Sequence, residues 1–593
     1  MNILIVGTSN FKPESGGIAE LGHQLTKALH MSGHNITVFA NLHKDSTNYD
    51  KECEYRILRI NPNMCYTYLE KEFSNQKPDL IFILSIGSSI ISCLRFGKKH
   101  NIPVALYVHG IEITKFKGPL FIQIVKKITK KFIIKQCNYI FCNSLNTMRL
   151  LLKFGVQSER IKILHPGINT EFLQENSVFI SNKFSFIKDN DFIFLTLGRV
   201  IERKGIETVI RALKIVISKH QNTKYIIAGP VDEQYKKYLL TIARELNIDS
   251  YITFTGMVSD AEKKYLLSRQ NCFIMPSKEL PDGDVEGFGI VFLEAALFSK
   301  PVIAGNSGGI PDAVVHNKTG ILVNPYSIDD VANAMIRLLN NNDLCLSFGK
   351  AGKERAINRF NWNKQAKLFI TYINEKRSIA QILDKTNNQY YNILDTLPLN
   401  NPIEKISAYE NLCILKEVLD SASIPFILFF GTLLGALREH DFISHDYDTD
   451  IVVLEPYKYM FIAIIPELER KGLILARTTK EDRVISLYRN NAYMDIYFAT
   501  IKRIGLYYKW YIDYSTVKKD YLLYYKTINF KGLELSIPEK SEKILKRFYG
   551  KDWNIPKIDY EANPDYYMKL IRFIKKPNKI LSLKRYINWI LKR

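Results

Sequence analysis

The chain has 593 residues, of which 46% are hydrophobic and 24% are charged, and its formal net charge is +22 at pH 7. A chain of this length exceeds what one hydrophobic core supports, so we expect roughly three or four domains. The balance of apolar and charged residues is typical of globular proteins and excludes extensive disorder. The eight cysteines show no CxxC spacing, which argues against a disulfide framework or zinc ribbon and favours a reducing compartment.

The N-terminus, residues 1–7, has no charged segment and no cleavage site, so it indicates a first strand rather than a signal peptide. The longest apolar run, about residues 80–94, is shorter than the roughly 20 residues needed to span a bilayer. We therefore expect no transmembrane helix and a cytoplasmic protein.

Two segments, residues 113–158 and 569–593, each contain nine lysines and arginines and no acidic residue. Between 114 and 135, lysines alternate with phenylalanine, leucine and isoleucine, which predicts an amphipathic helix on an anionic membrane surface. The tail 569–593 suggests the same partner. A helix with one face in the core, a solvated cationic surface and a nucleic-acid arm are the alternatives, but no nucleic-acid motif supports the last. We expect a peripheral protein at the inner face of the cell membrane that does not bind nucleic acid.

Strand and helix patterns alternate through the first 370 residues, with a helix predicted over 18–32. Apolar runs predict strands of a first sheet at 1–6, 35–40, 80–84, 103–108 and 139–142. A second set lies at 192–197, 224–228, 251–254, 272–275 and 301–304. This alternation predicts two Rossmann-like, doubly wound α/β domains, residues 1–180 and 181–375, with a ligand site in the cleft between them.

A different organisation follows. Residues 376–400 are polar and end near a Leu-Pro break, which predicts a helical linker. A helical pattern over 403–421 and a strand over 426–430 then open an α+β domain that we place at 401–560. The remaining residues, 561–593, form a basic amphipathic tail.

Glycines and cations follow the first strand of each Rossmann-like domain. Gly17 comes directly before the first helix, where the backbone can approach a phosphate or a sugar oxygen closely. Arg199 and Lys204 follow the strand 192–197. Two fixed cations at a cleft can hold a diphosphate and stabilise it as a leaving group, although a surface charge pair would look the same in isolation.

Two glutamates, Glu286 and Glu294, flank a glycine-containing turn and can face one pocket from a loop and a helix. Glu294 lies among apolar residues, where a carboxylate needs a partner, and the hydroxyl pair of a ribose would serve. A further glycine-rich loop, residues 305–312, follows a strand of the second domain and ends in Asp312.

Together these features resemble the retaining glycosyltransferase family 4, of GT-B fold, over about residues 1–375. The matching motifs are Gly17, His109-Gly110, residues 166–169, Arg199 with Lys204, Glu286 and Glu294 with Gly287 and Gly289, and residues 320–323. The resemblance implies cofactor-free, metal-independent sugar transfer, with retention, from a UDP or GDP sugar to a glycan or lipid-linked glycan.

The same resemblance implies roles for single residues. Gly17, Arg199 and Lys204 would bind the donor, the two cations at its diphosphate, and Glu294 would bind the ribose. Glu286 would lie near the donor sugar, and His109 beside the reacting carbon. Asp312 departs from the family, in which this loop usually carries glutamate.

The C-terminal part contains three alternating aspartates, Asp446, Asp448 and Asp450, at the start of an apolar run. Alternate residues of a strand share one face, and like charges so close together favour a bound cation. Mg²⁺ or Mn²⁺ held by a few carboxylates and phosphate oxygens is the chemistry we expect, with Asp495 as a further carboxylate from an apolar strand. An EF-hand calcium loop is one alternative, but the glycine and the distal glutamate of such a loop are missing here. A solvated acidic turn is the other alternative.

This region, about 400–557, resembles the LicD family, which has a nucleotidyltransferase-like fold and includes phosphocholine transferases. The matching segments are residues 430–438, the three aspartates, Asp495 and residues 547–553. The resemblance implies that Asp448, Asp450 and Asp495 hold the metal, that Asp446 is a ligand or supports one, and that Gly431 and Thr432 hold phosphates. Ser444-His445 replaces the Pro-Trp common in the family, which bears on the head group recognised.

The sequence thus predicts a bifunctional enzyme of surface-glycan synthesis, such as that of lipopolysaccharide. The first half would transfer a sugar, and the second a phosphorylated group, phosphocholine from a CDP-linked donor being the family-based expectation. An alternative is a glycosyltransferase with a LicD-like module that binds glycans without turnover.

Overall fold

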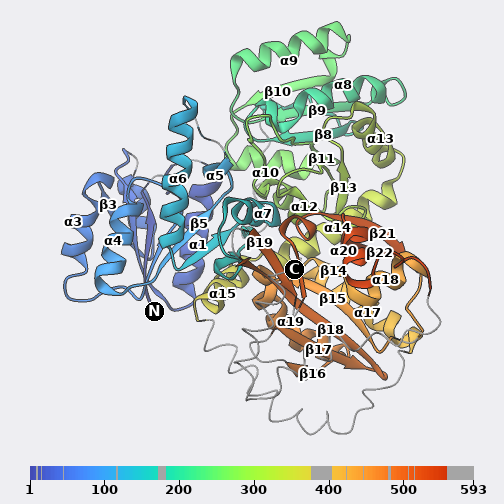
Figure 1. Cartoon of the computed structure of the whole chain (residues 1–593). Coiled ribbons are helices and arrows are strands. Elements are labelled where there is room, and N and C mark those ends of the chain that lie inside the picture. The colour runs from blue at the N-terminus through green and yellow to red at the C-terminus, as the bar shows by residue number, and fades with distance from the viewer. Residues whose placement is uncertain are drawn as a thin grey trace.

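The computed structural model describes residues 1–8, 11–14, 16–44, 46–114, 116, 118–170, 182–374, 404–422, 424–444, 446–478, 483–504, 507–512 and 515–556. The predicted linker and basic tail, Lys115, Lys117 and His445 lie outside these residues. Figure 1 shows two α/β domains and a third domain that lies against both of them.

The first domain is built on a parallel sheet of order β3-β2-β1-β4-β5-β6-β7. Its strands are β1 (Asn2–Gly7), β2 (Asn35–Asn41), β3 (Arg56–Ile60), β4 (Leu80–Ile83), β5 (Val104–Val108), β6 (Tyr139–Cys142) and β7 (Ile161–Ile163). The central strands are continuous apolar runs because helices cover both faces of the sheet. The predicted strands are confirmed, and β3 and β7 are additional.

The helices of the first domain are α1 (Gly17–Met31), α2 (Ser46–Glu52), α3 (Cys65–Glu72), α4 (Ile90–His100), α5 (Ile111–Thr114), α6 (Leu120–Gln136) and α7 (Leu145–Phe154). Helix α7 begins where the Ser144 hydroxyl accepts from the Thr147 N–H and ends at Gly155, whose backbone is left-handed.

The second domain repeats the architecture with a sheet of order β10-β9-β8-β11-β12-β13. Its strands are β8 (Phe192–Leu197), β9 (Thr223–Ala228), β10 (Ile252–Gly256), β11 (Cys272–Met275), β12 (Val302–Gly305) and β13 (Gly320–Val323). Its helices are α8 (Ile206–Ile217), α9 (Glu233–Glu245), α10 (Asp260–Arg269), α11 (Ile290–Leu297), α12 (Ile310–Ala313), α13 (Ile328–Leu339) and α14 (Asn342–Arg359). Two consecutive Rossmann-like domains are therefore present, as predicted.

Helix α15 (Trp362–Ile373) follows the second domain in sequence but packs on the first. The Phe369 ring lies 4.7 Å from that of Phe82 and 4.9 Å from that of Phe141, between ring centroids. The Tyr372 hydroxyl donates to the Ile163 carbonyl at 3.0 Å. The chain thus crosses back to the first domain before it enters the third.

The third domain has a mixed sheet of order β14-β15-β18-β17-β16, extended by β19 and β20. Its strands are β14 (Phe426–Leu428), β15 (Asp448–Leu454), β16 (Ile474–Thr478), β17 (Val484–Arg489), β18 (Ala492–Ile504), β19 (Tyr507–Ile512), β20 (Ser515–Lys518), β21 (Tyr525–Phe530) and β22 (Leu533–Pro538). Its helices are α17 (Lys405–Ser421), α18 (Phe430–Arg438), α19 (Lys458–Arg470) and α20 (Ser541–Tyr549). The predicted strand 426–430 is shorter than expected, because the chain turns at Phe430 (φ 40°) into α18.

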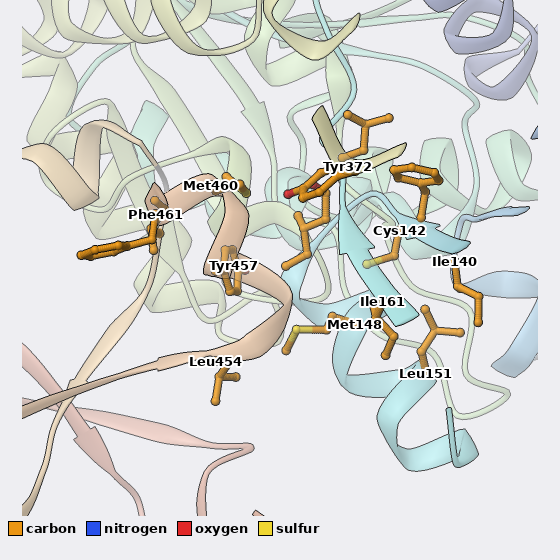
Figure 2. Close-up of a cluster of buried hydrophobic side chains, with 14 of the residues drawn as sticks. Ile140, Cys142, Met148, Leu151, Ile161, Tyr372, Leu454, Tyr457, Met460 and Phe461 are labelled. Atoms are coloured by element: carbon orange, nitrogen blue, oxygen red, sulfur yellow. The ribbon is translucent and has the colours of Figure 1, made fainter. Parts of the chain in front are cut away.

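One buried apolar cluster joins the first and third domains (Figure 2). It includes Met148 and Ile161 from the first domain and Leu454, Tyr457 and Phe461 from the third. The second domain has two clusters of its own. The first and third domains therefore share a continuous hydrophobic core. Among the described residues, no helix combines the length and the apolar character that crossing a membrane requires.

Candidate active sites

A compact group of charges surrounds Glu286, on a loop of the second domain that lies against the first domain. The Lys204 Nζ and the Arg203 guanidinium lie 2.6 and 2.7 Å from Glu286 Oε2, and Arg203 also pairs with Asp284 at 3.2 Å. Burial opposes ionisation of Glu286, but the two cations outweigh it and lower its pKa to about 2. Burial also lowers the pKa of Lys204. The positive charges of Arg203 and Arg199 lower this pKa further, whereas Glu286 raises it.

Arg199 itself is exposed, but it is close enough to affect the pKa of Lys204, so the two predicted donor-binding cations share one region. Glu294, on α11, pairs with Lys263 of α10, with the Lys263 Nζ 2.6 Å from Oε1. Gly17 lies at the start of α1, and a Cβ there would meet no atom of the described residues within 4 Å.

Loops of the second domain approach the first domain so closely that only glycine fits. A Cβ on Gly287 would lie 2.7 Å from Asn143 Nδ2 and 2.9 Å from the carbonyl oxygen of His109. A Cβ on Gly309 would lie 1.9 Å from the Gly287 carbonyl oxygen and 2.7 Å from Ser144 Oγ. His109 and the Glu286 loop, predicted from separate motifs, therefore meet across the cleft.

The His109 ring is held in one orientation. Its Nε2 lies 2.8 Å from the Leu84 carbonyl, which can only accept, so Nε2 carries the proton and Nδ1 is free to accept in the neutral ring. The ring stacks on Tyr107 at 4.8 Å between centroids, and the backbone N–H of His109 donates to Glu112 at 3.0 Å.

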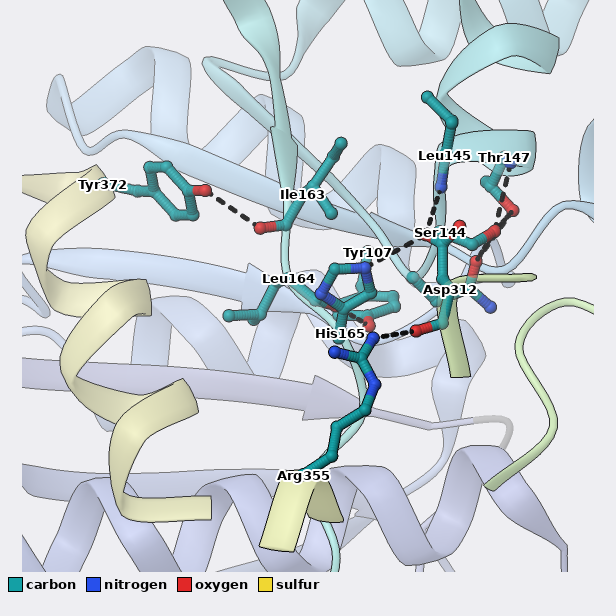
Figure 3. Close-up of polar contacts among 11 residues, drawn as sticks. Tyr107, Ser144, Leu145, Thr147, Ile163, Leu164, His165, Asp312, Arg355 and Tyr372 are labelled. Carbon is teal, nitrogen blue, oxygen red and sulfur yellow. Dashed lines mark hydrogen bonds and ion pairs between the residues drawn. The ribbon is translucent and has the colours of Figure 1, made fainter. Parts of the chain in front are cut away.

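Asp312 links the two domains (Figure 3). Its carboxylate accepts from the Leu145 N–H at the start of α7, at 2.7 Å, and from His165 Nε2 at 3.0 Å. Arg355 of α14 donates to the Asp312 carbonyl at 2.9 Å and to the Asp420 carbonyl of the third domain at 3.2 Å. The residue that departs from the family pattern thus links the first two domains, and Arg355 extends this connection to the third.

The predicted carboxylates of the third domain lie on, or just before, the adjacent strands β15 and β18. Asp450 and Asp495 are paired in register on these parallel strands, and both are buried. The Gly431 N–H donates to Asp450 Oδ2 at 3.0 Å, and the Thr432 hydroxyl accepts from the Asp450 N–H at 2.8 Å. Burial raises the pKa of Asp450 well above its ordinary value, and repulsion from Asp448, Asp446 and Asp495 raises it further.

The start of α18 lies against the aspartates. A Cβ on Gly431 would lie 2.0 Å from Asp446 Oδ2, so a side chain here would displace the Asp446 carboxylate. Tyr497, on β18, hydrogen-bonds Asp450, and the Ser486 hydroxyl donates to Asp495. These two hydroxyls orient the carboxylates, and neither had a recognisable signal in the sequence.

The arrangement suits a cation electrostatically. The carboxylates of Asp448, Asp446 and Asp495 all raise the pKa of Asp450, and a bound cation would relieve this repulsion. Within the described part of the chain, however, no group of three or more histidine, cysteine, aspartate or glutamate side chains is placed to hold a metal ion. The four predicted aspartates lie close enough together to affect the pKa of Asp450. Their binding of a metal stays a prediction.

Comparison with known families finds matches in both the N-terminal and the C-terminal part of the chain. Residues 15–172 match the family described as "Glycosyltransferase Family 4", and residues 179–355 match "Glycosyl transferases group 1". Residues 423–540 match "LicD/FKTN/FKRP, nucleotidyltransferase domain". Glycosyltransferase domains and a LicD-family domain are therefore joined in one chain.

Similar proteins match the glycosyltransferase part. A GDP-mannose-dependent α-(1-6)-phosphatidylinositol monomannoside mannosyltransferase of Mycobacterium tuberculosis is 26% identical over 62% of this chain and 96% of its own. The capsular polysaccharide biosynthesis glycosyltransferase CapM of Staphylococcus aureus is 25% identical over 46% of this chain and 72% of its own.

Solved structures agree on the fold. Anabaena HepE in complex with UDP and glucose has a TM-score of 0.51 at 17% identity, covering 63% of this chain and 100% of its own. A glycosyltransferase of Rickettsia africae has a TM-score of 0.53 at 19% identity, covering 63% of this chain and 97% of its own. The first two domains are a GT-B fold.

Proposed function

We propose that this protein performs two transfers on one surface glycan. The glycosyltransferase part would add a sugar, with retention, from a UDP or GDP sugar. The LicD domain would transfer a phosphorylated group, phosphocholine in the first instance, from a CDP-linked donor. The observation that carries the second activity is the register pairing of Asp450 with Asp495, both buried beside Asp446 and Asp448.

At the glycosyltransferase site, the chain's own charges suit a diphosphate leaving group. Lys204 is buried and held by Glu286, whereas Arg199 is exposed nearby, so Arg199 is the cation that an anionic donor can meet from solvent. Fixed cations stabilise the negative charge that develops on a departing diphosphate. Glu294, held by Lys263, would accept hydrogen bonds from the ribose, and His109 would lie next to the transferred sugar.

Sequence relatives support the nucleotide-sugar donor and the glycan acceptor. The mycobacterial relative is named for GDP-mannose and a phosphatidylinositol mannoside, and CapM for capsular polysaccharide. Both names describe carbohydrate synthesis, and the first includes a mannoside linked to a lipid.

At the LicD site, Asp448, Asp450 and Asp495 would hold Mg²⁺ or Mn²⁺, with Asp446 as a ligand or a supporting group. The ion, when bound, would neutralise the donor phosphates and make the nucleoside monophosphate a better leaving group. Gly431 leaves room beside Asp446, and its N–H orients Asp450. Tyr497 and Ser486 fix the carboxylates of Asp450 and Asp495.

The decisive test uses the whole protein. CMP release from CDP-choline, CDP-glycerol and CDP-ribitol is measured with Mg²⁺ and a mixed glycan acceptor, for the wild type and for Asp450→Asn. Release that requires both Mg²⁺ and Asp450 supports the transferase and identifies its donor. If the wild type and Asp450→Asn bind glycan equally well and neither releases CMP, the transferase is rejected in favour of the binding-module alternative.

We also propose that the protein lies on the inner face of the cell membrane through α6. Phe121, Phe132 and Ile128 are 76%, 65% and 63% exposed, and with Val125 they recur at helical spacing along one stripe. The opposite side faces the protein, where Ile133 and Ile134 are buried. Since the helix carries lysines and no acidic residue, an anionic lipid surface is the partner it suits.

A further inference from the structure

Three lysines from three different elements meet at the C-terminal end of α7. Lys519, in the short helical turn Lys519–Tyr521 after β20, donates from Nζ to the Leu152 carbonyl of α7 at 2.6 Å. Lys131 of α6 reaches the same end, since its Nζ would lie 2.9 Å from a Cβ on Gly155. Lys153 belongs to the last turn of α7 itself. We call this group the basic seam, because it lies where the first domain meets the LicD domain.

The three lysines of the seam lie close enough together for their positive charges to act on one another. Burial lowers the pKa of Lys519; Asp520 opposes this, whereas Lys131 and Lys153 add to it. A helix C-terminus offers the equivalent of about half a negative charge, which accounts for one capping lysine and not for three. Because like charges repel, such a cluster is more stable with an anion between its members.

Aromatic rings border the same cations. Tyr524, which is 40% exposed, has the Lys153 Nζ 5.0 Å and the Arg149 guanidinium 6.0 Å from its ring centroid. Arg149 also lies 5.0 Å from the Tyr525 ring. Cations bind phosphate oxygens, and an exposed ring with a polar tip offers a surface to an adjoining sugar. The combination suits a sugar phosphate better than an isolated inorganic ion.

The position of the basic seam further restricts which ligand it can bind. Lys131 is the neighbour in sequence of Phe132, the last residue of the exposed apolar stripe of α6. The seam therefore adjoins the proposed membrane face on one side and the LicD domain on the other. An acceptor anchored in the membrane would present its phosphate at this border.

We infer that the basic seam binds the phosphate group through which a glycan acceptor is attached to its lipid, and so holds that acceptor between the glycosyltransferase and LicD parts. This inference rests on the proposed function, because it presumes a lipid-linked acceptor. It adds a binding site outside both catalytic centres, made jointly by the two parts of the fusion.

The test compares vesicle binding by the full-length wild type and Lys153→Glu, with Lys214→Glu on α8 as a matched control at an exposed lysine. Neutral phosphatidylcholine vesicles carry either polyprenyl phosphate or phosphatidylglycerol at equal charge. We expect wild type to prefer polyprenyl phosphate, Lys153→Glu to lose that preference by about tenfold, and the control to keep it. Soluble pyrophosphate should compete in the wild type.

Equal binding to both vesicle types, or a preference that survives Lys153→Glu, overturns the inference. Pyrophosphate binding at the seam without any preference for polyprenyl phosphate would assign a free phosphate and overturn the lipid-linked source. Hydrolysis of the nucleotide sugar without acceptor is measured in the same three proteins. Loss of vesicle preference with intact hydrolysis separates a failure at the seam from a failure of sugar transfer.

Discussion

Asp450 and Asp495 stand side by side on the neighbouring parallel strands β15 and β18, both buried. Burial and the adjacent carboxylates raise the pKa of Asp450, so its ionised form destabilises the folded protein when no cation is bound. We expect Asp450→Asn to raise the melting temperature in EDTA at neutral pH while abolishing Mg²⁺-dependent phosphotransfer. Calorimetry and CMP release measure the two effects.

The sign of the pH dependence follows from the raised pKa. The unfolded carboxyl ionises at lower pH than the folded one, so wild-type stability should fall relative to Asp450→Asn as pH rises above the unfolded value. Glu245→Gln, an exposed carboxylate on α9, is the control and should show no such difference. A wild type that is equally stable with and without Mg²⁺, and never less stable than Asp450→Asn, would contradict this electrostatic picture.

Lys204 and Glu286 supply a prediction for the other site. Lys204→Ala should lower sugar transfer by about 10²-fold or more, because a cation that stabilises the leaving diphosphate is lost. Lys214→Ala on α8 is the matched control and should retain full activity. Transfer from the UDP and GDP sugars is the measurement, and Lys204→Ala activity within twofold of wild type would exclude the assigned role.

The ion pair of Lys204 and Glu286 should also make the stability of the protein depend on pH in the acid range. The pKa of Glu286 is lowered to about 2, so its stabilising contribution is complete above the unfolded pKa of about 4.5 and is lost between 4.5 and 2. Removing the charge by Glu286→Gln should destabilise the protein at pH 7 and cost little at pH 2. Urea unfolding at several pH values tests this, and an equal cost at both extremes would contradict it.

A side chain at Gly431 should displace the Asp446 carboxylate. The Cβ of Gly431→Ala would lie 2.0 Å from Asp446 Oδ2, so the carboxylate or the start of α18 must move. We expect loss of phosphotransfer with normal sugar transfer in the same protein, which serves as the internal control. Full phosphotransfer by Gly431→Ala would show that Asp446 need not stay in place.

Much of the fold was predictable because its signals are local. Buried parallel strands such as β6 and β11 are short apolar runs bounded by turns, and they appear where the sequence places them. Strand β3 carries two arginines and β7 has three residues, so neither has the apolar length that marks a strand. The return of α15 to the first domain depends on packing against Phe82 and Phe141, which no local pattern encodes.

The candidate sites were predictable in part for the same reason. Motif residues such as Glu286 and Asp450 stand out by type and spacing. Arg203, Lys263 and Tyr497 are defined by what they contact, and those partners are far away in sequence. The sequence marks Asp312 only as a departure from the family pattern, whereas the structure shows that it links the first two domains.

The exposed apolar stripe on α6 predicts that some substitutions weaken membrane binding without lowering the stability of the protein. Phe121→Glu and Phe132→Glu should weaken binding to anionic vesicles strongly without lowering the melting temperature, because both rings are exposed. Ile133→Glu, one residue further along, should destabilise the protein, because that side chain is buried. Vesicle flotation and thermal unfolding distinguish them, and unchanged vesicle binding by the two phenylalanine variants would exclude α6 as the membrane contact.

The shared core of the first and LicD domains predicts that they unfold together. Tyr457 is fully buried between them, and Tyr457→Ala should lower the free energy of unfolding by about 3–5 kcal/mol. Since the cavity lies in a joint core, sugar transfer and phosphotransfer should be lost at the same temperature. Tyr447→Ala, at an exposed tyrosine, is the stability control. Phosphotransfer lost well before sugar transfer would mean that the LicD domain unfolds by itself, and the two sites could then not hold one acceptor in a fixed geometry.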